Sequence, residues 1–162
     1  MIGSGSGLSI SNSYATGDVS GISTVGGLIG FGSGSSILNS YATGDISGNT
    51  SNDRLAGLIG SSNSSVQITD SFSTGSIVNT GTGSAHGITN SSLAILTNVY
   101  WNNSAPGTDA LTCFNGGDTN CTIETDITQF YQPTYPVYTR PGFEWDFTSI
   151  WQDQPAALPI LR

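Results

Sequence analysis

The sequence predicts an all-β protein, a parallel β-helix (β-solenoid) of about four coils followed by an irregular, aromatic C-terminal cap. Three observations lead to this prediction. Residues 1–104 repeat with a period of about 30, their units lack runs of helix formers, and apolar residues alternate with polar ones inside each unit. The 162 residues fit one structural domain, because a single hydrophobic core commonly spans roughly 100–200 residues.

Two short sequences recur in step along residues 1–104. The first is NSYATGDVSG at residues 12–21, which returns as NSYATGDISG at 39–48, DSFSTGSI at 70–77 and NVYWN at 98–102. The second is GLIG at residues 27–30, which returns at 57–60 and, altered, as GITN at 87–90. Two sequences that share one period indicate stacked structural repeats rather than a biased composition.

The composition of each unit favours strands over helices. Glycine, serine and threonine are frequent and are separated by β-branched or aromatic residues. Such segments are costly in a helix, whereas they suit short strands joined by tight turns. We therefore expect each coil to contain three short strands and three corners.

Alternation along a strand places residues i, i+2 and i+4 on one face. In-register stacking then aligns three rows, which are Ile10, Ile37, Ile68 and Leu96; Asn12, Asn39, Asp70 and Asn98; and Tyr14, Tyr41, Phe72 and Tyr100. We expect the isoleucine and tyrosine rows to face inward. The asparagine row should hydrogen bond between coils, because an unpaired buried amide costs about 1–3 kcal/mol.

Residues 105–138 contain no repeat and are predicted to form an irregular insert. Cys113 and Cys121 flank a loop rich in glycine and asparagine, which predicts a disulfide, with two free thiols as the alternative. A zinc site would require more ligands than these two cysteines and the single histidine. The loop acids and amides lack calcium-loop spacing and are better explained by Asx turns. No metal or cofactor is therefore expected.

Residues 139–162 are predicted to form the C-terminal cap. Trp145 and Trp151 lie there, and Trp101 ends the last repeat. We expect these aromatic residues to close the hydrophobic end of the solenoid. The alternative is that the three tryptophans contact a ligand or partner, for example as a platform for sugar rings.

The chain carries 11 acidic residues and three arginines, giving a net charge of −8. This charge argues against nucleic acid and against an anionic membrane surface, and no apolar run is long enough to span a bilayer. No catalytic residues are predicted. The enzymatic alternative is a polysaccharide-cleaving pair formed by Asp18 and Asp45 on adjacent coils. An ice-binding face formed by Thr16, Thr43 and Thr74 is a further alternative.

The repeated N-S-Y-A-T-G-D-[VI]-S-G, followed by G-G-L-I-G, resembles the GLUG-type repeat of bacterial and archaeal surface proteins, including regions of large adhesins and some secreted proteases. The resemblance extends to the end of such arrays through YWN at residues 100–102, WDFTSIW at 145–151 and LPILR at 158–162. It implies a scaffold or binding segment without assigned catalytic residues.

The sequence therefore predicts an extracellular or cell-surface module that is structural or adhesive, either a filament subunit or part of a larger adhesin. The chain starts within a repeat, and we expect its uncapped N-terminal coil to self-associate or to continue onto a longer surface chain. The alternative function is carbohydrate binding. Five Asn-X-Ser/Thr sequences are candidate glycosylation sites, at Asn49, Asn63, Asn90, Asn102 and Asn120.

Overall fold

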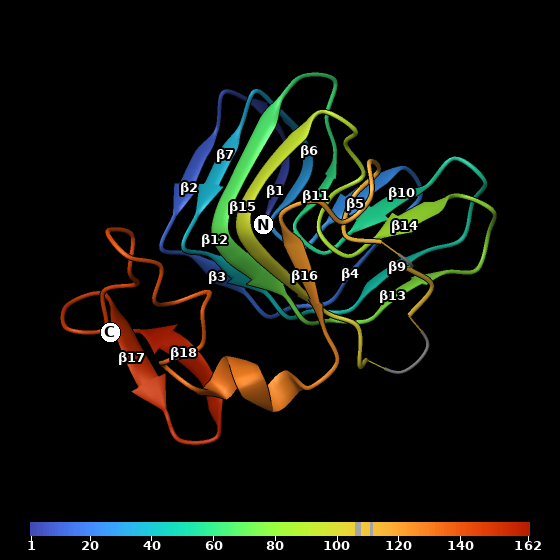
Figure 1. The fold of residues 1–162 in the computed structure, drawn as a ribbon. Coiled ribbons are helices and arrows are strands. Elements are labelled where there is room, and N and C mark those ends of the chain that lie inside the picture. Colours follow the sequence, from blue (N-terminus) through green and yellow to red (C-terminus); the bar gives the residue numbers. More distant parts are fainter. Residues whose placement is uncertain (106–107, 111) are drawn as a thin grey trace.

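The computed structural model describes residues 1–105, 108–110 and 112–162. The chain winds through about four turns of parallel strands, and only 3% of it is helical. Figure 1 shows the solenoid obliquely, with the corresponding strands of successive coils side by side. The predicted fold class is confirmed.

The first three coils repeat the same succession of strands, with one exception in coil 3. Coil 1 contains β1 (Ile2–Ser6), β2 (Ser9–Ser11), β3 (Tyr14–Ala15), β4 (Val19–Gly21) and β5 (Thr24–Gly26). Coil 2 contains β6 (Ile29–Ser33), β7 (Ser36–Leu38), β8 (Tyr41–Ala42), β9 (Ile46–Gly48) and β10 (Arg54–Ala56). Coil 3 contains β11 (Ile59–Ser61), β12 (Val66–Ser73), β13 (Ile77–Asn79) and β14 (Ser84–His86). Its single strand β12 pairs with two strands of coil 2, β7 and β8.

Stacking of these coils produces four parallel sheets around the core, not the three expected. We name them A to D in the order in which the chain enters them. Three of them have three strands each: sheet A is β1-β6-β11, sheet C is β4-β9-β13 and sheet D is β5-β10-β14. Sheet B contains β2, β7, β12, β15 (Ala94–Asn102) and β16 (Cys121–Glu124), with β3 and β8 beside them. The coil has room for a fourth strand because glycine-rich corners turn the chain within a few residues.

The isoleucine and aromatic rows pair in register along sheet B. Ile10 lies opposite Ile37, which lies opposite Ile68, and Tyr14 lies opposite Tyr41. Phe72 and Tyr100 continue the aromatic row, and Leu96 completes the isoleucine row. Equivalent residues of successive coils therefore stack directly on one another.

The two rows nevertheless face opposite sides of sheet B, so the prediction that the tyrosine row points inward is wrong. The residues between the two rows, Asn12, Asn39, Asp70 and Asn98, have φ values of 47°, 48°, 46° and 52°. Asparagine and aspartate tolerate this left-handed conformation better than other non-glycine residues. The bend interrupts the alternation, so isoleucine enters the core and the aromatic residue emerges outside.

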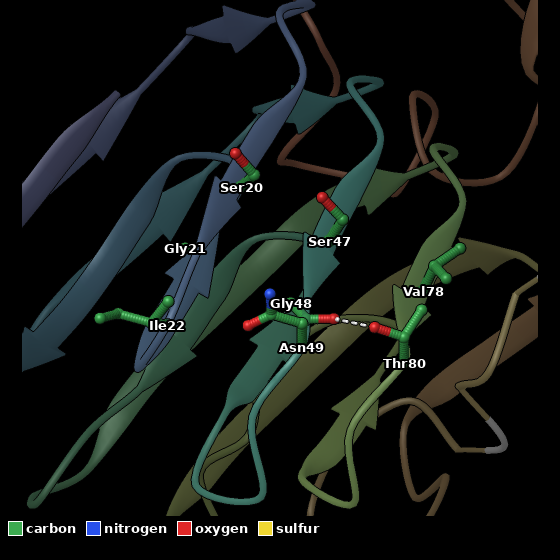
Figure 2. A pocket seen from close by; sticks show the side chains of 8 residues that line it. All are labelled: Ser20, Gly21, Ile22, Ser47, Gly48, Asn49, Val78 and Thr80. Carbon is green, nitrogen blue, oxygen red and sulfur yellow. Dashed lines mark hydrogen bonds between the residues drawn. The ribbon is translucent and has the colours of Figure 1, made fainter.

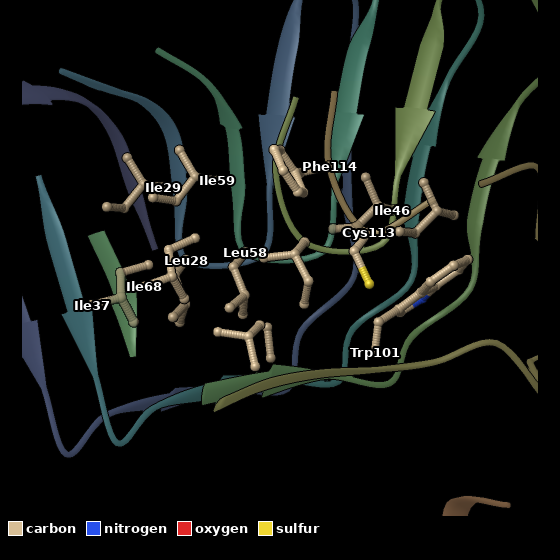
Figure 3. Packing of buried hydrophobic residues seen from close by; sticks show 14 of the residues in the cluster. Leu28, Ile29, Ile37, Ile46, Leu58, Ile59, Ile68, Trp101, Cys113 and Phe114 are labelled. Carbon is tan, nitrogen blue, oxygen red and sulfur yellow. The ribbon is translucent and has the colours of Figure 1, made fainter. Parts of the chain in front are cut away.

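The core inside the coils is built from aliphatic residues that all four sheets contribute (Figure 3). Ile29, Leu58, Ile59 and Ile68 are completely buried. Burying a side chain of this size contributes about 1.5–3 kcal/mol, which makes the aliphatic rows the main source of stability in a chain with few charges.

Residues 108–110 and 112–124 form the described part of the fourth turn although they lack the repeat sequence. The Asp109 N–H donates to Ile77 O on sheet C (2.7 Å), Phe114 bridges Thr89 beside sheet A, and β16 extends sheet B. The predicted insert, residues 105–138, is thus partly a coil. Its residues 106–107 and 111 lie outside the described residues.

The C-terminal segment, residues 125–162, packs on the outer side of sheet B and not on the end of the solenoid, where the cap was expected. It contains the 3-10 helix η1 (Ile127–Tyr131) and the antiparallel pair β17 (Trp151–Gln154) and β18 (Ala157–Leu161). Figure 1 shows it in orange and red beside the coils. The outward-facing aromatic row supplies the apolar surface that it covers.

Candidate interaction surfaces

The N-terminal end of the solenoid is an open edge. Strands β1, β2, β4 and β5 are each the last strand of their sheet. Ile10 and Val19 are only partly buried there, whereas their neighbours in coil 2, Ile37 and Ile46, are each 1% exposed. Ile22 is 74% exposed beside this edge. A cavity of about 220 Å³ lies between β1, β4 and β5, with Ile2, Val19 and Val25 among its lining residues.

Side chains hold adjacent coils together in a repeated pattern. Asp18 Oδ1 accepts a hydrogen bond from the Asp45 N–H (2.9 Å), and Asp45 Oδ1 accepts one from the Ser76 N–H (2.8 Å). In the opposite direction, the Ser13 N–H donates to Ser40 Oγ (3.1 Å). These contacts give Asp18 and Asp45 a structural role, because each carboxylate is bound to the backbone of the next coil.

The other end of the solenoid is closed. The indole of Trp101 fills the core there and is completely buried, and a Cβ on Gly87 would lie 2.1 Å from the Trp101 ring. In the preceding coils the same row carries small residues, Ala15, Ala42 and Ser73. Ile123 of β16 lies opposite Trp101, so the indole fills the interior beneath the last turn, which lacks the repeat sequence.

The predicted disulfide between Cys113 and Cys121 forms and ties the last turn to β16. Hydrogen bonds within this loop satisfy amides that would otherwise face outward. The Cys113 N–H donates to Asp118 Oδ1 (2.7 Å), and the Phe114 N–H donates to Gly117 O (3.2 Å). Asp118 is therefore engaged in capping the turn. Within the described part of the chain, no group of acidic, histidine or cysteine residues is arranged to hold a metal ion.

His86 lies beneath the closing turn. Its Nδ1 is 2.9 Å from Thr112 Oγ1. Burial lowers the pKa of His86 from its usual value of 6.5, although the nearby Asp118 partly opposes the shift. The neutral imidazole is thus the form that suits the folded chain, as expected for a histidine beneath a packed turn.

Asp70 anchors the C-terminal segment to sheet B. Arg140 binds its carboxylate with two hydrogen bonds, Nε to Oδ1 (2.7 Å) and Nη2 to Oδ2 (2.6 Å). Trp145 Nε1 donates to Asp70 O (3.0 Å), and Asn98 Nδ2 donates to Asp70 Oδ1 (2.7 Å). Asp70 and Asn98 therefore contact the segment and are linked to each other across coils. The prediction that the whole row hydrogen bonds between coils is wrong for Asn12 and Asn39, whose Oδ1 atoms are buried without a hydrogen-bond partner.

Stacked aromatic rings fill the interface between sheet B and the segment. The rings of Tyr41 and Phe72 stack with centroids 4.9 Å apart, and Trp145 and Trp151 pack beside them with centroids 4.5 Å apart. The Tyr41 hydroxyl donates to Pro159 O (2.6 Å). Burial raises the pKa of Tyr41 above its usual range, with a smaller contribution from Tyr14.

The alternative reading of the tryptophans as a ligand platform is wrong. Trp101, Trp145 and Trp151 are 0%, 3% and 0% exposed, so none offers a free indole face. The aromatic row ends differently in coil 1, where Tyr14 remains 38% exposed.

Two of the five candidate glycosylation sites are buried. Asn90 is 5% exposed and donates through Nδ2 to Ser84 Oγ (2.7 Å), and Asn102 is 1% exposed. Neither amide is accessible in the folded chain. Asn49, Asn63 and Asn120 are exposed, and their glycosylation stays a prediction.

Two surface grooves lie on the outer faces of the sheets. The groove in Figure 2, about 350 Å³, crosses sheet C over Ser20, Ser47 and Val78, where the Thr80 hydroxyl donates to Gly48 O. The second, about 380 Å³, crosses sheet B beneath Phe143. Phe143 was not singled out in the sequence, because an isolated phenylalanine next to Pro-Gly gives no signal of its own.

Thr16, Thr43 and Thr74 follow directly after strands and lie at a corner, so they form no flat ice-binding strand face.

Within the described residues, no helix is both long and apolar enough to cross a membrane.

Comparison with known families supports the repeat assignment. The model of the GLUG motif matches residues 21–47, which run from the end of β4 once around the solenoid to β9. The match therefore covers one turn and joins two consecutive copies of the repeated sequence. No curated protein and no solved structure gave a significant match to the chain. The resemblance to GLUG-type repeats is confirmed.

Proposed function

We propose that this GLUG-repeat chain is an extracellular structural module whose first coil stacks onto a further coil of the same repeat type. The observation that carries the proposal is the contrast between its two ends. Both ends finish in edge strands, but the ladder residues of the first coil are only partly buried. At the other end Trp101 fills the core, and the disulfide-tied last turn accepts hydrogen bonds from the Gly87 and Ile88 N–H groups.

The open edge offers the groups that the repeat uses between its own coils. In coil 2 the Tyr41 N–H donates to Ser13 O (3.1 Å), and the Asp45 N–H donates to the carboxylate of Asp18. The corresponding N–H groups of coil 1 belong to Tyr14 and Asp18 and lie at the free edge. A preceding GLUG coil would present a carbonyl and a carboxylate to them in the same register.

The closed end argues against the head-to-tail fibre of identical copies that the sequence suggested. Such a fibre needs two open ends, but amides of the last turn are satisfied within the Cys113–Cys121 loop. A module that terminates a longer solenoid fits this asymmetry better. An adhesive or filamentous role would then belong to the larger surface assembly.

An extracellular location is supported by the disulfide and by the repeat type. Disulfides persist mainly in oxidising compartments and are rare in the cytosol. Both cysteines of the chain are paired. Protease treatment of intact cells that express the protein tests this part, because degradation without lysis requires exposure on the outside.

The stacking proposal can be tested by adding a coil. A copy of residues 29–58 is placed before Ile2, and amide hydrogen exchange is compared with that of the original chain. We expect the amides of β1, β2 and β4 to gain protection up to the level of coil 2, and the melting temperature to rise.

The matched control carries aspartate in the added coil at the positions of Ile37 and Ile46, and it should give neither effect. Unchanged exchange in coil 1 with the unsubstituted coil would contradict the proposal. So would a stable dimer joined through the first coils of two copies, since it would show that the edge prefers an antiparallel partner.

A further inference from the structure

We propose that the groove between the outer face of sheet B and Phe143 binds a neutral oligosaccharide. This site uses the outer face of sheet B, including Ser9 and Ser11 of the edge strand β2, but it does not depend on the stacking proposal. It also differs from the tryptophan platform considered above, because the three tryptophans are buried.

The floor of the groove is formed by the outward residues on either side of the isoleucine row. Because Ile10, Ile37 and Ile68 point into the core, their neighbours point outward. The two outward rows are Ser9, Ser36 and Gln67, and Ser11, Leu38 and Thr69, each paired in register across β2, β7 and β12. The floor thus presents hydroxyl and amide groups beside an apolar surface to which Leu38 contributes.

Phe143 forms one wall, and its position is fixed from below. The Phe143 N–H donates to Arg140 O (2.9 Å) across a turn in which Gly142 has a φ of 82°. The Arg140 guanidinium carbon lies 3.9 Å from the centre of the Phe143 ring, and Arg140 is itself held by Asp70. The ring stays 54% exposed beside the groove.

The chemistry of the groove favours an uncharged sugar. None of its lining residues is ionisable, and the nearby charge of Arg140 is compensated by Asp70. Hydroxyl and amide side chains both donate and accept hydrogen bonds, which matches the hydroxyl groups of a sugar. The C–H face of a pyranose ring can pack against the exposed phenylalanine.

The geometry disfavours a peptide strand. A strand that adds to a sheet pairs with main-chain groups at an edge, whereas the groove lies on a face where β7 is paired on both sides. Binding there must use side chains. Neighbouring strands are about 4.8 Å apart, close to the advance of one pyranose ring in an extended glycan, so each ring would meet one rung.

The test uses five neutral hexasaccharides as probes: those of cellulose, xylan, mannan, amylose and chitin. Each is titrated into the 15N-labelled protein and followed by NMR and calorimetry. We expect at least one to bind and to shift the amide signals of Gln67, Thr69 and Phe143. Phe143→Ala should weaken that binding about tenfold, as expected for the loss of one stacked ring.

Gln67→Ala provides a second variant on the floor of the groove and should also weaken binding. Ile22→Ala is the matched control, since it removes an aliphatic side chain that is 74% exposed and does not line this groove. It should leave the affinity unchanged. Circular dichroism establishes that each variant is folded.

Three results would overturn the proposal. The first is that none of the five sugars binds at millimolar concentration. The second is that binding survives both Phe143→Ala and Gln67→Ala. The third is that the groove signals shift with protein concentration alone, which would assign this face to a second copy of the chain.

Discussion

Replacing Arg140 by methionine should weaken the attachment of the C-terminal segment more than replacing Asp70 by asparagine does. In Arg140→Met the carboxylate of Asp70 is left 0% exposed without its cation, and only Asn98 still donates to it from a side chain. Breaking a buried ion pair from one side costs about 3–5 kcal/mol. Because Arg140 is itself 26% exposed, we expect the free energy of unfolding to fall by an amount near the lower end of this range, about 3 kcal/mol.

Asp70→Asn should cost less, about 1–2 kcal/mol. It restores the residue found elsewhere in the row, keeps a side chain that tolerates a φ of 46°, and leaves a guanidinium that can turn toward water. The double variant Asp70→Asn/Arg140→Met buries no unpaired charge. It should therefore resemble Asp70→Asn alone, so the coupling free energy between the two positions equals the cost of Arg140→Met, about 3 kcal/mol.

The assay is urea unfolding of the four proteins, with the midpoint and slope compared. Hydrogen exchange in β17 and β18 would report whether the segment detaches before the coils unfold. A loss below about 1 kcal/mol for Arg140→Met, or a larger loss for Asp70→Asn than for Arg140→Met, would refute the view that this pair is the buried anchor.

Three further predictions concern the closed end. Trp101→Ala should lower the free energy of unfolding by about 3–5 kcal/mol in urea titrations, because the indole fills the last coil; a loss below 1 kcal/mol would mean that the end is not packed as described. Replacing both cysteines by alanine should cost about 2–3 kcal/mol in the same assay, from a loop closed over a separation of eight residues. His86→Gln should lose less stability than the wild type between pH 7.5 and 5.5, because the lowered pKa of His86 lets the unfolded chain bind a proton that the folded chain does not; equal losses would contradict this.

The stacking of coils could be predicted from the sequence because it depends on a pattern that survives locally. Ile10 and Ile37 occupy the same place in two nearly identical sequences, and their burial inside a solenoid requires that they meet. The period and the alternation were therefore enough to predict the register between coils. The number of corners was not predictable in the same way, since glycine and serine occur both inside strands and between them.

The outward direction of the tyrosine row was missed because counting by two assumes an unbroken strand. A single left-handed residue at Asn12 or Asn39 changes the face of everything after it. The sequence did contain a signal, because asparagine is one of the few residues that accept this conformation and it recurs before each Ser-Tyr pair.

The position of the C-terminal segment depended on contacts between residues far apart in the chain. Asp70 and Arg140 are separated by 70 positions, and no period relates them. The available signals were that Asp70 replaces the asparagine of its row and that Arg140 is one of only three arginines in the chain.

Departures from the repeat identify where a coil meets something other than a coil. Asp70 departs from its row and binds Arg140, and Trp101 departs from a row of small residues and closes the end. In coil 1, residues 12–21 match 39–48 at every position except the exchange of valine for isoleucine, whereas residues 2–11 differ from 29–38 by Ser4 for Phe31, Leu8 for Ser35 and Ser11 for Leu38. A first coil adapted to face water would be expected to replace its partly buried isoleucine and its exposed tyrosine by polar residues. Ile10 and Tyr14 are nevertheless retained, although Tyr14 is 38% exposed, which is what we expect if coil 1 has a further coil beside it, as we propose.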